Sequence, residues 1–298
     1  MSHVPVLAEE IISLLEIKPN SVYIDGTLGG AGHSKLILEK LQSQGHLYSF
    51  DQDREVLERL TNEAKAHQNW TLVHDNFSEI YNYCHKNKIE ITGGILLDLG
   101  LSSIQLDDPL RGFSFQRESE LDMRLNPDAD LSADDVINSY SEEDLANIIY
   151  KYGEERKSRQ IAAAIIKNRP IHSTLKLGEL IKTIYARGSH GKTFRIHPAT
   201  QTFQALRIYI NRELEVLEEI LELDFTVLKP GAIIAIISFH SLEDRIVKNA
   251  LRKYAKEGQL EILTKKPIIA SDEECKLNPR SRSAKLRVAR VQVNEVKG

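Results

Sequence analysis

The residues best suited to chemistry are acids and glycines that follow short apolar runs. Asp25 closes the run Val22–Ile24, and glycines then occupy positions 26, 29, 30 and 32. Glycine lets the backbone turn sharply, and without a Cβ a ligand can lie directly against the main chain. The pattern becomes helical from His33, so free N–H groups at a helix start would face such a ligand. The stretch is typical of a ligand-binding turn, although a turn that merely connects strand and helix remains the alternative.

The glycine turn indicates which ligand to expect. No lysine follows the glycines, so the phosphate-loop pattern is absent, and the dinucleotide pattern GxGxxG does not fit in register. The acid at Asp25 suits a ligand with a positive centre better than a pyrophosphate. S-adenosylmethionine carries an ammonium beside a sulfonium and no phosphate, and it is therefore the ligand that we expect.

Three further positions could complete such a site. Asp51 closes a second apolar run, where acids commonly bind a ribose diol, although it could instead cap the helix that begins near Asp53. Phe77 follows a third run and could stack on adenine or belong to the core. Asp98 follows a fourth run and precedes Ser102 and Ser103.

The elements that position these residues read as an α/β fold. Four short runs rich in β-branched and aromatic residues alternate with helical patterns, at 22–24, 46–50, 70–74 and 95–97. Such alternation predicts a mostly parallel sheet whose ligands gather at the carboxyl ends of the strands. We therefore expect Asp25, Asp51, Phe77 and Asp98 to line one rim.

The alternation stops in the middle of the chain. Helices are predicted at 141–150, 159–168 and 175–185, and Ser132 and Ser141 have the spacing of helix caps with Asp135 and Asp144. These features predict an inserted helical domain at 110–210, between the two parts of a main domain at 1–109 and 211–298. The main domain resumes with one long helix at 203–223, strands at 232–237, 260–263 and 286–293, and a helix at 243–254.

Composition limits the cellular setting. The chain has 298 residues, 41% hydrophobic content and a mean hydropathy of −0.32, which are ordinary for a soluble protein. The longest apolar run, 232–237, is too short to span a bilayer, and the start of the chain does not resemble a secretory signal. Two unpaired cysteines indicate a reducing compartment, so we expect a cytoplasmic protein. The ten histidines do not fall at metal-ligand spacing with cysteines or acids, so no metal site is predicted.

The net charge of −4 hides two charged stretches. Residues 118–144 contain ten acids and one base, whereas residues 276–290 contain six bases and no acid. The basic stretch is either a solvated edge or a patch that contacts phosphates. Its bases are Lys276, Arg280, Arg282, Lys285, Arg287 and Arg290.

Several long strings resemble one family. YIDGTLGGAGHS, DLGLSSIQLDDPLRGFSF, HPATQTFQALRIYINREL, ISFHSLEDRIVK and NPRSRSAKLRVA are similar to segments of the MraW/RsmH family, methyltransferases that act on a cytosine of 16S ribosomal RNA. The resemblance runs from His3 to about Arg290. RGFSF, FQALR and SFHSLEDRIVK are far more specific than a glycine loop. Ala31 stands where members often carry glycine, and its Cβ would crowd the loop slightly.

The resemblance implies a class I S-adenosylmethionine-dependent methyltransferase, Rossmann-like and mostly parallel, whose helical insertion recognises the substrate. It implies a substrate cytidine in 16S ribosomal RNA, within the small ribosomal subunit or as free RNA, and it leaves open whether the protein is a homodimer. Asp25 and Gly30 come from the residues themselves. The resemblance implies seven cofactor-binding residues, of which only Gln105 lies outside the places that the sequence pattern had already indicated: Ala31, Gly32, His33, Asp51, Phe77, Asp98 and Gln105.

The implied reaction transfers a methyl group to the 4-amino group of cytosine. Asp98, with Ser102, is the best candidate to accept hydrogen bonds or a proton from that amine. His240 could move the proton, or it could be a helix cap or a phosphate contact. Phe113, Phe115 or Phe239 could stack on the base.

The target base would have to leave its stack, and the basic stretch would then track phosphates through Arg280, Arg282, Lys285 and Arg287. A non-catalytic RNA-binding or ribosome-assembly protein is the alternative. A nicotinamide dehydrogenase would require the missing GxGxxG loop.

Overall fold

The computed structural model describes residues 5–42, 44–186 and 197–293. The predicted basic piece at 187–192 and the start of the family resemblance at His3 lie outside these residues. The chain divides into two compact units. Unit 1 comprises residues 1–101 and 214–298, and unit 2 comprises residues 102–213. The boundaries therefore fall at 101/102 and 213/214, where the sequence suggested 109/110 and 210/211.

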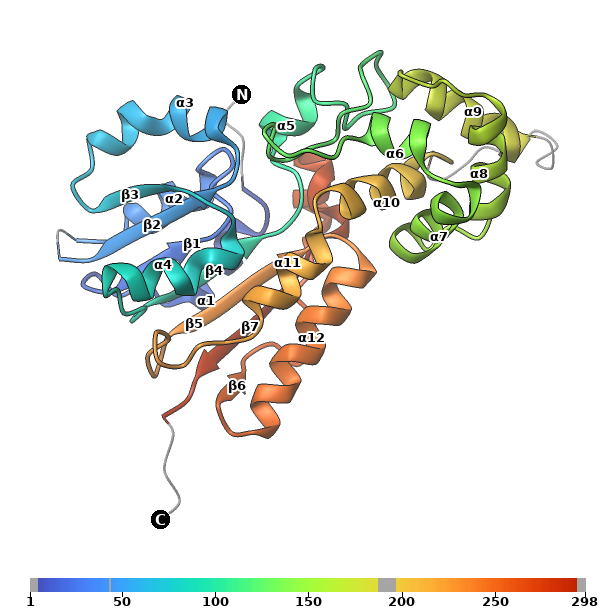
Figure 1. The fold of residues 1–298 in the computed structure, drawn as a ribbon. Helices are drawn as coiled ribbons and strands as arrows, with labels where there is room; N and C mark the ends of the chain where they lie inside the picture. The colour runs from blue at the N-terminus through green and yellow to red at the C-terminus, as the bar shows by residue number, and fades with distance from the viewer. Residues whose placement is uncertain (1–4, 43, 187–196, 294–298) are drawn as a thin grey trace. The chain divides into compact units, whose positions relative to one another are not determined.

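Unit 1 contains one twisted sheet, whose order is β3-β2-β1-β4-β5-β7-β6 in the described residues (Figure 1). The first five strands in this order are parallel, and β7 runs antiparallel between β5 and β6. All seven predicted strands are confirmed. They are β1 (Val22–Asp25), β2 (His46–Asp51), β3 (Trp70–His74), β4 (Gly94–Asp98), β5 (Ile233–Ser238), β6 (Leu260–Ile262) and β7 (Lys285–Val291).

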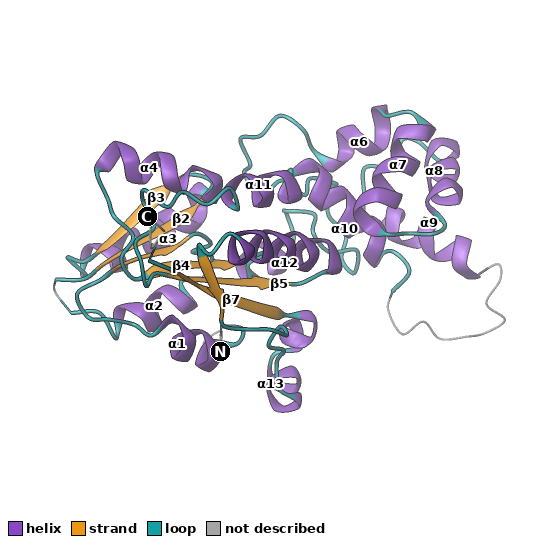
Figure 2. Cartoon of the chain, turned by 90° about the horizontal axis from the view of Figure 1, so that it is seen from below, coloured by secondary structure: helices purple, strands orange, loops and turns teal. Residues whose placement is uncertain are grey.

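Helices cover both faces of this sheet (Figure 2). One face packs against α1 (Ala8–Leu15), α2 (Gly32–Leu38) and α3 (Arg54–Lys65), which share a buried apolar core with alternate strand residues such as Tyr23 and Leu96. The other face packs against α4 (Ile80–Asn87), α11 (Glu213–Ile220) and α12 (Ser241–Lys256), with Ile24 and Leu97 in the second core. Burial on both faces explains why the central strands are continuously apolar.

In the described part of unit 2 the regular elements are helices, joined by loops and by one isolated bridge between Glu120 and Ser173. Its helices are α5 (Ser103–Asp107), α6 (Ala133–Ser139), α7 (Glu142–Gly153), α8 (Ser158–Lys167), α9 (Thr174–Ala186) and α10 (Thr200–Ile210). Ser132 accepts a hydrogen bond from Asp135 N and Ser141 one from Asp144 N, so both predicted caps are confirmed. The three helices predicted after Ser141 are α7, α8 and α9.

The single helix predicted at 203–223 is wrong, because the structure breaks it into α10 and α11. Asn211 ends α10 by donating its side-chain amide to Arg207 O and Met123 O, and its Oδ1 accepts Leu125 N. Arg212 then adopts a left-handed φ of 50°. The apolar stripe that suggested one helix belongs to two: Leu206 is buried in unit 2, and Leu217 is buried in unit 1.

The remaining helices are short. They are the single turn η1 (Phe77–Glu79), α13 (Asp272–Leu277) and η2 (Pro279–Ser283). The longest of the described helices is α12, with 16 residues. Across the described ranges no helix combines the length and apolarity that crossing a bilayer requires.

Candidate functional site

The carboxyl ends of β1, β2 and β4 bring Asp25, Asp51 and Asp98 to one edge of unit 1. Asp25 is in register with Ser49 of β2 and with Leu96 of β4, so Asp51 and Asp98 each lie two residues beyond it on the neighbouring strands. The strand order reverses between β1 and β4, and in open α/β sheets such a point forms the ligand crevice. The expectation of a common rim is confirmed for the three acids.

The glycine turn is held in a specific conformation above this rim. Gly29 has a φ of 46° and donates its N–H to Asp51 Oδ2 at 3.0 Å. Ala31 has a φ of 60° at the start of α2, a left-handed conformation that costs a residue with a Cβ about 1–2 kcal/mol. The departure from glycine at Ala31 is therefore a matter of backbone conformation more than of crowding.

Gly30 is the exposed point of the turn. A Cβ built on Gly30 would have no atom within 4 Å, whereas at Gly32 it would lie 3.0 Å from the Pro5 ring. Gly30 thus leaves open space directly over the backbone. This open space fits a ligand that lies against the main chain, as S-adenosylmethionine would.

Asp25 lies beneath the turn and supports it. Its Oδ1 accepts Thr27 N at 3.0 Å, and its Oδ2 accepts Ser34 Oγ at 2.6 Å. Burial raises its pKa, partly offset by the bond from Ser34. Ser34 Oγ also lies 2.8 Å from Ser49 Oγ, which accepts Trp70 Nε1. Both carboxylate oxygens are thus engaged within the protein, and the direct cofactor contact predicted for Asp25 stays a prediction.

Asp51 holds the turn from the end of β2. Besides Gly29, it accepts Asp53 N through Oδ1 at 2.9 Å, and Asp53, not Asp51, caps α3 by accepting Glu55 N. Each oxygen of a carboxylate has a further lone pair, so Asp51 can still accept a ribose hydroxyl. Burial raises its pKa to about 6, and the bonds from Asp53 N and Gly29 N oppose the shift.

This pKa gives a prediction for cofactor binding. Asp51 is a carboxylate above pH 6 and is protonated below it, where it loses acceptor capacity toward Gly29 N and the ribose. We expect affinity for S-adenosylmethionine to fall as pH drops from 7.5 to 5, and calorimetry across this range measures it. The Asp51→Asn variant has no carboxyl group to titrate, so it should bind S-adenosylmethionine weakly at every pH. If its affinity changed with pH as that of the parent does, this role of Asp51 would be contradicted.

Phe77 opens η1 directly after β3. It is partly buried, packs on the core beneath the sheet, and lies beside the turn, since a Cβ on Gly26 would come within 3.1 Å of its Cβ. The packing bears out core membership, and the adenine contact stays a prediction.

Asp98 and His33 form a close pair at the switch point. Asp98 N donates to Thr27 Oγ1 at 2.7 Å, which ties β4 to the turn. His33 Nε2 lies 3.6 Å from Asp98 Oδ2, and the exposed fractions of the two side chains are 5% and 25%. Asp98 Oδ1 and both ring nitrogens of His33 are buried without a hydrogen-bond partner within the described residues. Polar atoms in that state indicate a site that a ligand completes.

Ser102 and Gln105 lie in unit 2 and bind each other. Ser102 Oγ accepts Gln105 N, and Gln105 Oε1 accepts Ser102 N, so together they form the capping box of α5. The spacing S-x-x-Q could have predicted this box. The cofactor role of Gln105 and the catalytic role of Ser102 stay predictions.

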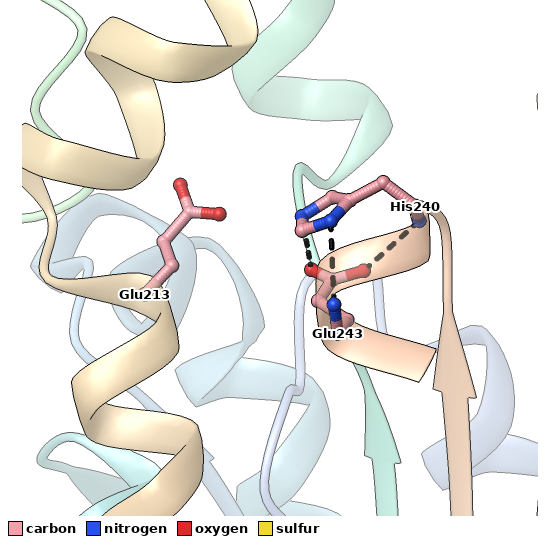
Figure 3. Close-up of side chains that lie close together, drawn as sticks. All are labelled: Glu213, His240 and Glu243. Atoms are coloured by element: carbon pink, nitrogen blue, oxygen red, sulfur yellow. Dashed lines mark hydrogen bonds and ion pairs between the residues drawn. The ribbon is translucent and has the colours of Figure 1, made fainter. Parts of the chain in front are cut away.

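His240 is the N-cap of α12, which is one of the three roles that the sequence left open for it. Its Nδ1 accepts Glu243 N, and Glu243 Oε2 accepts the backbone N–H of His240 (Figure 3). The same oxygen accepts the backbone N–H of Phe239. His240 Nε2 lies 3.1 Å from Glu243 Oε1. Glu213, also labelled in Figure 3, belongs to unit 2, where it pairs with Arg207 at 2.9 Å.

The candidate stacking residues have different surroundings. Phe113 is buried, and Phe115 stacks on His197 with ring centroids 4.4 Å apart, both within unit 2. Phe239 in unit 1 is partly buried and follows β5, next to β4. A Cβ on Gly100 would lie 3.7 Å from its ring.

The predicted RNA-binding bases also differ in exposure. Arg282 is exposed, Arg280 is half-buried, and both lie on η2. Arg287 is buried on β7 and donates Nε to Asp244 Oδ1 at 2.7 Å, while Lys285 lies 3.7 Å from the same carboxylate. Burial and pairing of Arg287 could not be read from the sequence, because they depend on the place of β7 beside α12.

Sheet order and site together define a class of protein. A parallel sheet with an antiparallel β7 between β5 and β6, a glycine turn after β1, and acids after β2 and β4 are the features of a class I S-adenosylmethionine-dependent methyltransferase. The predicted fold class is therefore confirmed.

Comparison with known proteins places the chain within that class. The model of the MraW methylase family matches residues 1–292, so the chain belongs to this family. Proteins named "Ribosomal RNA small subunit methyltransferase H" are similar to it over nearly its whole length. The protein from Koribacter versatilis is 48% identical, covering 97% of this chain and 93% of the relative, and the one from Deinococcus deserti is 48% identical, covering 98% and 95%.

Proposed function

We propose that this protein transfers a methyl group from S-adenosylmethionine to the 4-amino group of a cytidine in small-subunit (16S) ribosomal RNA, in the cytoplasm. The observation that carries the proposal is the pair of unsatisfied groups, Asp98 and His33, at the switch point of a methyltransferase fold. Relatives that share nearly half their residues with this chain bear the name of a small-subunit ribosomal RNA methyltransferase.

Unit 1 supplies the groups that would hold the cofactor. The backbone from Gly30 to His33 offers the open surface of the turn, Asp51 offers acceptors for the ribose, and Phe77 offers an apolar surface for the adenine. When bound, S-adenosylmethionine supplies a methyl group on a cationic sulfur, which is a strong electrophile.

Asp98 has two tasks in the proposed reaction. The lone pair of the cytosine amine is delocalised into the ring, and hydrogen bonds accepted by the Asp98 carboxylate localise it on nitrogen. The amine nitrogen forms a bond to the methyl carbon, the carbon–sulfur bond breaks with its electron pair remaining on sulfur, and one N–H proton leaves. Asp98 is positioned to accept this proton, and its exposed fraction of 25% leaves it accessible.

The RNA surface proposed on unit 1 is centred on η2. Arg282 and Arg280 lie there, with Lys285 at the start of β7. Arg287 is excluded, because its guanidinium is buried and neutralised by Asp244. Unit 2, the helical insertion, is proposed to recognise the substrate.

Reversing the two η2 arginines tests this surface. We expect the double variant Arg280→Glu and Arg282→Glu to bind RNA at least about tenfold more weakly at low salt and to lose about two units of the salt-dependence slope. Filter binding at several salt concentrations measures both. Lys40→Glu with Lys65→Glu reverses two exposed lysines elsewhere on unit 1 and should change neither. Unchanged RNA affinity in the arginine variant would remove η2 from the interface.

One experiment tests the whole proposal. Labelled S-adenosylmethionine is incubated with small ribosomal subunits and with naked RNA, and the methylated nucleoside is identified. N4-methylated cytidine is the expected product, and the better substrate shows whether the assembled subunit or free RNA is the natural target. A non-catalytic assembly protein would bind RNA without binding S-adenosylmethionine in calorimetry and without transferring label.

A further inference from the structure

The His33 imidazole is buried, and the charged groups that act on it are acids. Its side chain is 5% exposed, and its Nε2 lies 3.6 Å from Asp98 Oδ2. The charged groups that act on it come from three elements, namely Asp98 of β4, Asp25 of β1 and Glu274 of α13. Glu274 is itself fixed, since its Oε1 accepts Leu7 N at 2.9 Å. The imidazole is therefore acted on both by Asp25, which supports the glycine turn, and by Asp98, the proposed acceptor for the amine.

Burial of an imidazole that makes no hydrogen bonds costs free energy, unless its positive charge interacts with neighbouring acids. Both ring nitrogens have no hydrogen-bond partner among the described residues, and the neighbouring Asp98 Oδ1 has none either. Asp98 and Asp25 lie on the adjacent strands β4 and β1, so a positive charge on this ring would be attracted to both carboxylates. An imidazolium attracts the Asp98 carboxylate, whose Oδ2 lies 3.6 Å from Nε2, and so can fix its orientation.

We propose that His33 is a positioning residue that acts through Asp98: its imidazolium holds that carboxylate in the orientation in which it accepts the hydrogen bond of the amine that is methylated. The inference rests on the proposed role of Asp98. It differs from the cofactor contact that the resemblance implies for His33, because that contact can be made by the backbone of the turn. The imidazole acts on the acceptor side of the reaction instead.

The sign of the pH dependence follows from the surroundings. Burial alone would lower the pKa of His33, but the contact with Asp98 and the charges of Asp98, Asp25 and Glu274 outweigh burial and raise it above 6.5. The imidazolium is thus present below this raised value and is lost as pH rises through it. The rate of methyl transfer should fall over the same interval.

The test compares His33→Gln and His33→Lys with the parent protein, using kcat from pH 6 to 9.5 with small subunits as substrate. His33→Gln should lower kcat by about 10–100-fold and abolish the fall at high pH, because glutamine has no proton to lose. His33→Lys restores a cation, so kcat should recover and the fall should move to higher pH. His46→Gln is the matched control, because His46, on β2 of the same unit, is partly buried and pairs with Thr71, and the described residues show no acid paired with it.

Binding measurements separate the possible failures. Calorimetry with S-adenosylmethionine should give similar affinities for the parent and the His33 variants, which also shows that they are folded. A His33→Gln variant that keeps both the parent kcat and its fall at high pH would overturn the inference. Loss of cofactor affinity with kcat unchanged would assign His33 to cofactor binding and would equally overturn it. If the parent protein itself transfers no methyl group to RNA, the proposed function fails before His33 is tested.

Discussion

Replacing Asp98 by asparagine is expected to lower kcat by about 10²–10³-fold, the largest effect that we predict for a single residue. Asparagine has nearly the same shape but carries no charge, cannot take the amine proton, and presents an amide that donates where the carboxylate accepts. The fold should survive, because the bond that ties β4 to the turn uses Asp98 N and not its side chain. Single-turnover transfer of labelled methyl groups at saturating cofactor isolates this step.

Asp75→Asn provides the matched control for this prediction. Asp75 also follows a strand at the carboxyl edge of the sheet, but it is exposed and its carboxylate accepts only Asn76 N among the hydrogen bonds described here. Its replacement should leave kcat near the parent value. An Asp98→Asn protein that binds cofactor and turns over within about threefold of the parent would place the proton acceptor elsewhere.

The two acceptor-side predictions are coupled. If His33 acts only through Asp98, adding His33→Gln to Asp98→Asn should cost little beyond Asp98→Asn alone, because residues that act as a unit are not additive. Independent losses in the double variant would mean that the imidazole contributes by another route. The comparison of the double variant with the single variants therefore tests whether His33 acts through Asp98, which neither single variant tests.

The sheet and its rim could be predicted because both follow from local pattern. A buried parallel strand is a short apolar run, and a polar residue that closes such a run must lie at the carboxyl edge. Asp51 and Asp98 were found in this way. The pattern says nothing about which way a carboxylate points. Asp25 points beneath the turn because Ser34, from the following helix, reaches its second oxygen.

Other features depend on segments far apart in the sequence. Arg287 belongs to a basic stretch, but β7 enters the sheet next to β5 and brings it against Asp244 of α12. The break after α10 depends on Asn211 binding Met123 and Leu125, which come from a distant loop. By contrast, the capping box at His240 and Glu243 has a local signal, an acid three residues after a capable acceptor, and the sequence left that alternative open.

Gly30→Ala is expected to weaken S-adenosylmethionine binding by about 10–100-fold without destabilising the protein. Its new methyl group would meet no protein atom within 4 Å, and the φ of Gly30 is not among the positive values of the chain. The methyl group would instead occupy the space over the turn in which we place the cofactor, and an overlap that costs about 1–3 kcal/mol corresponds to this loss of affinity. Calorimetry measures the binding, and thermal unfolding without cofactor measures the stability.

Gly26→Ala is the comparison for Gly30→Ala, because it should destabilise the fold and leave the cofactor contact itself unchanged. A Cβ at Gly26 would lie 2.4 Å from Leu97 Cδ2 and 3.2 Å from Ile80 Cδ1, within the core beneath the turn. This overpacking should destabilise the fold by about 1–3 kcal/mol. Cofactor affinity should fall only as far as the fold is lost.

If Gly30→Ala bound the cofactor as tightly as the parent, the ligand would not lie against this backbone, and the arrangement of Asp51 and Asp98 around it would have to be abandoned.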